Sequence, residues 1–107
     1  MSPFDPYTFL CAFSIAIAHL AARRFEQAIE WADRSLHDQP RMVSAMRLKV
    51  AANAHLGRLD EARAELSRML ANDPKLTIAG FRDVAHYLAP EVRELYVTGL
   101  RLAGLPE

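Results

Sequence analysis

Apolar residues recur along much of the chain at intervals of three and four positions, the spacing that places side chains on one face of an α-helix. The two clearest stretches lie at 25–36 and 59–70. Their recurrent positions are Phe25, Ala28, Ile29, Ala32, Ser35 and Leu36 in the first, and Leu59, Ala62, Leu66, Met69 and Leu70 in the second. Each stretch stops before a proline, Pro40 or Pro74, and the residue before a proline is disfavoured in the α conformation. The sequence therefore predicts a helix before each of these prolines.

The two stretches belong to a repeat with a period of 34 residues, which continues backwards to Pro6. The aligned pairs are Ala28 with Ala62, Leu36 with Leu70, and Pro40 with Pro74. Upstream of each helix lies a second apolar-periodic stretch, at roughly 7–22 and 42–56. Gly57 suits the turn that follows 42–56, because glycine tolerates the left-handed backbone that ends many helices. These features predict two helical hairpins, at about 7–39 and 42–73.

After Pro74 the period ends, but the pattern of two helices continues. One apolar-periodic stretch runs from Ile78 to Leu88, and Pro90 suits the first turn of another helix that ends at Gly104. We predict a degenerate third hairpin at about 77–104 that caps the first two. Hairpins with this period bury their apolar faces by stacking on one another. The expected fold is therefore all-α, an α-solenoid of three helical hairpins in a single domain of residues 1–107.

The second helix of each full hairpin carries a family resemblance. FEQAIEWADRSLHDQP and LDEARAELSRMLANDP resemble the second helix of the tetratricopeptide repeat family, with an aromatic or leucine opening, an acid, a small alanine and a closing proline. The first helices depart from the family pattern, for example at Val50, where a small residue is usual. The resemblance implies a right-handed solenoid that serves as a protein interaction module.

A narrower resemblance covers most of the chain. The LTI and FRD segments and the ending GLRLAGLPE look like the carboxyl terminus of bacterial adenylate or guanylate cyclases that carry tetratricopeptide repeats, and SPFDPYTF and AIEWADRSL are similar to that same region. This implies a non-catalytic, regulatory part of a longer cyclase in cyclic nucleotide signalling. Two alternatives stay open: the sensor or interaction tail of a winged-helix transcription regulator, and a free-standing adaptor.

The family resemblance also implies where a partner would bind, because first helices line the concave side of such solenoids. Carried onto this chain, that surface comprises Leu10, Phe13, Ile17, Leu20, Ser44, Arg47, Ala51 and Ala54, with Phe81 added by the cap. Some family members hold a carboxylate with a clamp of lysines and asparagines. Here Arg47 is the one suitable cation and Ala51 stands where an asparagine would be wanted, so a clamp is disfavoured. We expect a protein or peptide partner in a mainly apolar groove.

Residues 6–22 contain no Asp, Glu, Lys or Arg. The run is slightly short for a bilayer crossing and contains Thr8, Ser14 and His19, so a helix buried on most sides is favoured over a membrane segment. Terminal hairpins of a solenoid normally carry a polar outer face, which this one lacks. We therefore expect helix 7–22 to be covered, either by an earlier repeat or by a second copy, and predict a homodimer through this helix.

Composition and motifs exclude several functions. The chain has 13 basic and 13 acidic side chains, which leaves no net field for nucleic acid or an anionic membrane. The single cysteine, Cys11, lies among apolar residues and is expected to be buried and inert in a reducing cytoplasm. The four histidines lack metal-ligand spacing, and no phosphate-binding loop or nucleophile elbow is present. We expect no catalysis, no metal and no cofactor.

Overall fold

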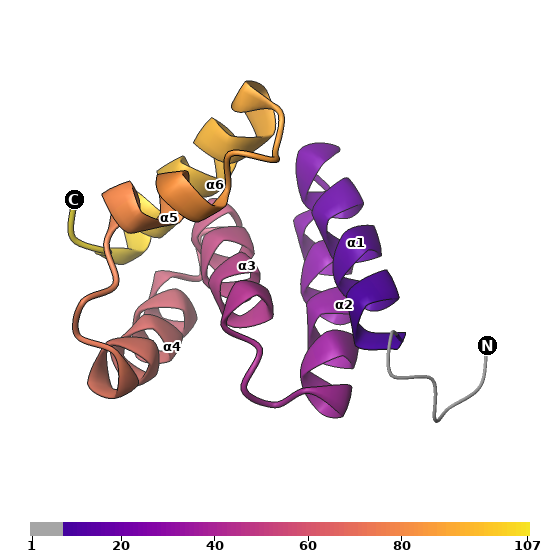
Figure 1. Cartoon of the computed structure of the whole chain (residues 1–107), viewed down its shortest axis with the longest axis horizontal. Coiled ribbons are helices and arrows are strands. Elements are labelled where there is room, and N and C mark those ends of the chain that lie inside the picture. Colours follow the sequence, from indigo (N-terminus) through magenta and orange to yellow (C-terminus); the bar gives the residue numbers. More distant parts are fainter. Residues whose placement is uncertain (1–7) are drawn as a thin grey trace.

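Six helices form most of residues 8–107, the part of the chain that the computed structural model describes (Figure 1). They are α1 Thr8–Ala21, α2 Phe25–Asp38, α3 Val43–His55, α4 Leu59–Asn72, α5 Ile78–Val84 and α6 Pro90–Ala103. No strand occurs among these residues. The predicted all-α fold is confirmed. Pro6, the earliest point of the 34-residue period, lies outside the described residues.

The turns inside the first two hairpins have the same backbone geometry, although only one contains glycine. Arg23 and Gly57, 34 positions apart, have positive φ angles of 60° and 80°. The next backbone N–H in each turn donates to a carbonyl five residues back, Arg24 to His19 at 2.8 Å and Arg58 to Asn53 at 2.9 Å. This left-handed cap satisfies carbonyls at the helix end and reverses the chain. The repeat therefore extends to the turn, although Arg23 in the first hairpin is not a residue that favours this backbone.

Small side chains allow the helices of the two hairpins to approach closely. Ala28 and Ala62, which define the repeat, are fully buried at equivalent positions of α2 and α4. Leu36 and Leu70 are half-buried, and Pro40 and Pro74 are exposed just beyond the ends of these helices. Ser35 is also fully buried, and its hydroxyl donates to the carbonyl of Phe9 at 2.8 Å, which ties α2 to α1.

The first two hairpins stack side by side, as the repeats of a solenoid do, but the third hairpin is placed differently. Of the two helices of the first hairpin, α3 contacts α2 extensively and α1 lightly, so the second hairpin stacks on the first. Helix α6 instead packs mainly on α3, with lighter contacts to α4 and α1, while the backbone of α5 lies next to α6. Figure 1 shows α5 and α6 lying across α3. The third hairpin thus covers part of the side formed by the first helices, α1 and α3.

The crossing of α6 over α3 depends on Gly99. A Cβ at this position would lie 2.6 Å from the carbonyl oxygen of Ala51, so only glycine permits the observed approach. Two hydrogen bonds fix the same crossing. The Tyr96 hydroxyl donates to the Ser44 carbonyl at 3.0 Å, and His55 Nε2 lies 2.7 Å from the Leu95 carbonyl, to which its N–H donates.

Helix α5 is shorter than the sequence predicts, since it ends at Val84 and not near Leu88. The Leu88 side chain is buried after the chain leaves the helix, and Ala89 takes the extended conformation required before Pro90. The short helix is held at its start. Thr77 Oγ1 accepts from the Gly80 N–H at 3.0 Å, and the carbonyls of Pro106 and Glu107 accept from Ile78 and Ala79 at 2.7 and 3.1 Å.

Candidate functional site

The nine residues predicted for the concave surface divide into two groups. Leu20, Ala51, Ala54 and Phe81 are buried, each with no more than 4% of its surface exposed. For two of them the cause is the third hairpin: α6 lies on Ala51 through Gly99, and Phe81 packs its ring against Tyr96 with centroids 4.6 Å apart. Leu20, Ala51 and Ala54 therefore belong to the core, whereas Phe81 is buried but still borders a pocket. Leu10 is exposed, and Phe13, Ile17, Ser44 and Arg47 are partly exposed, so the accessible surface is narrower than expected.

Four of the predicted residues meet in one pocket of about 280 Å³, which we call the aromatic pocket. Its lining comes from α1, α3, the α5 segment and α6, and consists of Phe13, Ser44, Arg47, Phe81, Val84, Ala85, Tyr87 and Tyr96. The predicted residues Leu10, Ile17, Leu20, Ala51 and Ala54 do not line it.

Sequence reasoning missed most of the contribution of the third hairpin to this pocket. Val84 and Tyr87 are 55% and 64% exposed, among the most exposed large apolar side chains of the described residues. A signal for them exists, because Phe81, Val84 and Tyr87 recur at intervals of three, which is typical of one helix face. What the sequence could not show is that this face meets α1 and α3.

Arg47 is the one charged residue in the lining of the aromatic pocket. Its guanidinium carbon lies 5.1 Å from the centroid of the Phe81 ring, within the range of a cation–π interaction. Its Nε is buried and has no hydrogen-bond partner, and no carboxylate among residues 8–107 forms an ion pair with it. Burial raises the pKa of Tyr96, so this neighbour stays a neutral donor.

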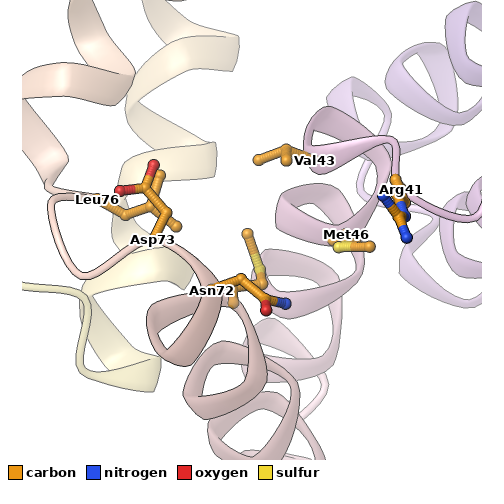
Figure 2. A pocket seen from close by; sticks show the side chains of 7 residues that line it. Arg41, Val43, Met46, Asn72, Asp73 and Leu76 are labelled. Atoms are coloured by element: carbon orange, nitrogen blue, oxygen red, sulfur yellow. The ribbon is translucent and has the colours of Figure 1, made fainter.

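A second pocket, of about 500 Å³, lies between the start of α3 and the end of α4. Its lining residues are Arg41, Val43, Met46, Met69, Asn72, Asp73 and Leu76. Figure 2 shows Arg41 and Asp73 on opposite sides, with Met46 and Val43 between them. None of the residues predicted for the concave surface lies here. This pocket contains both a cation, Arg41, and an anion, Asp73, so its lining does not favour a ligand of one charge.

One face of α1 is open and carries no charge. Leu10 and Ile15 are 43% and 38% exposed, and Ser14 and Ala18 are exposed beside them. Cys11 is exposed on this face too, so the prediction of a buried cysteine is wrong. The reason is helical phase: Ala12, Ala16 and Leu20 take the buried positions of α1.

Other chemical features of the described residues are sparse. No three His, Cys, Asp or Glu side chains of residues 8–107 gather where they could hold a metal ion. Among the described helices, none combines the length and apolar character needed to cross a bilayer.

Comparison with known proteins supplies a family. The family model described as tetratricopeptide repeat matches residues 13–76, which is more than half of the 107-residue chain. The match covers most of α1 and all of α2 to α4, the two hairpins that follow the 34-residue period, and leaves out α5 and α6. Searches of curated proteins and of solved structures gave no match to the chain. Hairpin geometry, equivalent turns and the family match agree, and the chain belongs to the tetratricopeptide repeat family.

Proposed function

We propose that this chain is a binding module that takes an apolar segment of another protein into the aromatic pocket and has no catalytic role of its own. The observation that supports this most is the exposure of Val84 and Tyr87 beside a pocket lined by Phe13. Large apolar side chains grouped around a concavity on a protein surface typically mark an interaction site. The family to which the chain belongs also favours a protein partner. Residues 1–107 act in this proposal as one binding unit.

The proposed setting follows from the narrower sequence resemblance. The ending GLRLAGLPE and the AIEWADRSL segment favour the carboxyl-terminal, regulatory part of a bacterial adenylate or guanylate cyclase in the cytoplasm. The tail of a winged-helix transcription regulator and a free-standing adaptor are the alternatives. The gene region upstream of Met1 decides among the three, because it encodes a cyclase core, a winged helix or neither.

Binding is tested with peptides selected from a random library against the wild-type chain, with affinity measured by fluorescence anisotropy. Tyr87→Ser removes an exposed side chain of the pocket and should weaken binding by about tenfold or more. Leu102→Ser is the matched control, because Leu102 is 48% exposed on α6 and does not line the pocket. Equal affinity of the two variants, or no peptide bound at all, would contradict the proposal.

The absence of catalysis is tested separately. The purified chain, incubated with ATP or GTP and a divalent metal ion, should form no cyclic nucleotide. Sustained turnover that follows the chain through purification would overturn the module interpretation.

We also propose that the open face of α1 joins two copies of the chain. Leu10 and Ile15 provide exposed apolar area, and Ser14 and Ala18 between them are small enough for close helix approach. A two-fold contact through one helix places the same face on both sides, which is the commonest arrangement of homodimers.

A further inference from the structure

Arg47 differs from the cations of residues 8–107 that form ion pairs. Six Lys or Arg side chains form ion pairs within residues 8–107, for example Lys49 with Asp33 at 2.7 Å and Arg58 with Glu26 at 2.7 Å. In each of these pairs at least one of the two side chains is exposed, so water also reaches the pair. Arg47 is partly buried, yet its Nε has no hydrogen-bond partner and none of the eight residues of the aromatic pocket is acidic. The neutral groups Phe81 and Tyr96 neighbour this guanidinium, but no carboxylate of residues 8–107 neutralises it. A partly buried charge without an opposite charge is unfavourable, so an anion from outside would be stabilised here.

The surroundings of Arg47 define the kind of anion. A guanidinium binds a carboxylate through two parallel hydrogen bonds, and apolar walls strengthen such a pair by excluding water. Arg47 is the single cation of the lining, which suits the one negative charge of a carboxylate better than the higher charge of a phosphate. The Tyr96 hydroxyl is already engaged with the Ser44 carbonyl and leaves Arg47 as the main recognition group.

The size and lining of the pocket decide how the carboxylate is carried. The volume of about 280 Å³ is just below that of small-molecule sites, which run from about 300 to 1,000 Å³, so the pocket holds little more than one or two side chains. A free chain terminus would bring its backbone amide into the pocket, where that amide needs an acceptor. A glutamate side chain reaches Arg47 through methylene groups, which need none. Exposed Val84 and Tyr87 then remain at the rim for apolar neighbours of the glutamate.

We propose that Arg47 binds the side-chain carboxylate of a glutamate within an otherwise apolar segment of a partner protein. The residues flanking this glutamate pack on Phe13, Val84 and Tyr87. The inference rests on the proposed function, since it names the chemistry of the segment that enters the aromatic pocket.

The test uses the full chain and a random peptide library. Each peptide is joined to a carrier through its own carboxyl end, so that the only carboxylates it offers are side chains. Selected peptides should carry an acidic residue, most often glutamate, between apolar ones. Resynthesised as amides, they should lose about 10- to 100-fold in affinity when this glutamate is changed to glutamine, the loss expected for one charged hydrogen-bonded pair. The glutamine peptide leaves the protein unaltered, so this result is independent of folding.

Protein variants complete a double-mutant cycle. Arg47→Met should lower the affinity for the glutamate peptide to the same extent. The Arg47→Met protein should bind the glutamate and glutamine peptides with equal affinity. Arg47→Lys should recover part of the affinity, since lysine keeps the charge without the planar pair of donors. A melting curve and circular dichroism verify that each variant is folded. Independent losses from the two changes would overturn the inference.

The remaining outcomes separate the inference from the proposed function. Selected peptides that contain no acidic residue, but whose binding still depends on Tyr87, would support the binding function and overturn the role of Arg47. A gain of affinity from a free carboxyl terminus on a peptide without acidic side chains would assign Arg47 to a chain terminus and likewise overturn the inference. Peptide binding that is indifferent to both Tyr87 and Arg47 would contradict the two proposals together.

Discussion

Arg23 and Gly57 occupy the same place in successive hairpin turns and have the same left-handed backbone, with φ angles of 60° and 80°. An L-residue with a Cβ is strained in this conformation by roughly 1 kcal/mol, while glycine is not. The first turn is held in spite of this strain by the hydrogen bonds and helix packing around it, including the 2.8 Å bond from Arg24 N–H to the His19 carbonyl. A turn residue can therefore be dictated by the repeat geometry and not by its own preference.

The two turns form a natural matched pair of substitutions. Arg23→Gly should raise the free energy of unfolding by up to about 1 kcal/mol through relief of backbone strain, and Gly57→Arg should lower it by about the same amount. No atom lies within 4 Å of a Cβ built on Gly57, so the second change tests backbone strain without a clash. Urea unfolding followed by circular dichroism measures both. A destabilised Arg23→Gly chain would show that the arginine side chain itself stabilises the turn.

At the scale of the elements, the decisive contact is the one between α6 and α3. Stacking of α3 on α2 follows the repeat, but α6 takes its position by a close approach at Gly99 and by the hydrogen bond from Tyr96 to Ser44. This crossing creates the aromatic pocket, because it carries Val84 and Tyr87 toward Phe13 and Arg47. The proposed binding function of the aromatic pocket therefore depends on the packing of α6 on α3.

Gly99→Ala tests this docking. On a solvent-exposed face of a helix, this change would raise the free energy of unfolding by up to about 1 kcal/mol, because alanine has the higher helix propensity. Here the new Cβ would meet backbone atoms of Ala51 at 2.6 and 2.8 Å, which cannot move aside alone. The helices must separate, and we expect a net loss of about 1–3 kcal/mol in unfolding free energy. Thr98→Ala, at the exposed neighbouring position, is the control and should change stability little. Equal stability of the two variants would contradict the close crossing.

The ion pair between Arg82 and Glu94 joins α5 to α6 and makes this hairpin sensitive to acid. Two hydrogen bonds from Arg82, at 2.7 and 3.2 Å, hold the pKa of Glu94 below its ordinary value near 4.5. A lowered pKa means that the pair stabilises the fold above about pH 4.5 and that this contribution is lost as pH falls through the folded pKa. Both groups are exposed, so the effect is small.

Melting temperatures at neutral and acid pH measure this contribution. Wild type should melt slightly higher than Arg82→Met at neutral pH, and the difference should vanish at acid pH once Glu94 is protonated. Arg63→Met is the control, because Arg63 is exposed and in no ion pair among residues 8–107, and its difference from wild type should not depend on pH. A pH-independent Arg82→Met difference would exclude the ion pair as its cause.

At the scale of the whole molecule, the open face of α1 predicts self-association. Wild type should sediment as a dimer at high concentration, and Ile15→Glu should sediment as a monomer, because it places a charge amid the exposed apolar face. Phe13 is less suitable for this test, since it lines the aromatic pocket. Leu102→Glu introduces the same charge at a similarly exposed residue of α6 and should stay dimeric. A wild type that remains monomeric, or equal effects of the two variants, would contradict a dimer through α1.

The positions of five of the six helices and the pairing of α1 with α2 and of α3 with α4 are encoded locally in the sequence. Periodicity, helix-ending prolines and the turn at Gly57 act between residues at most a few positions apart, and such local interactions are legible along the chain. The 34-residue period adds long-range order, because equivalent residues such as Ala28 and Ala62 meet equivalent neighbours. For this reason the all-α solenoid of hairpins could be predicted without coordinates.

The place of the third hairpin and the set of exposed side chains depend on long-range contacts that the sequence pattern does not reveal. Gly99 and Ala51 are 48 positions apart and outside any period, so nothing local indicates that they touch. That contact buries Ala51 under α6 and removes it from the expected surface, and the same docking brings Val84 and Tyr87 beside Arg47. Cys11 shows the same limit on one helix: an almost uncharged run such as α1 has no polar face to mark its phase, and its burial is set by the helices that pack against it.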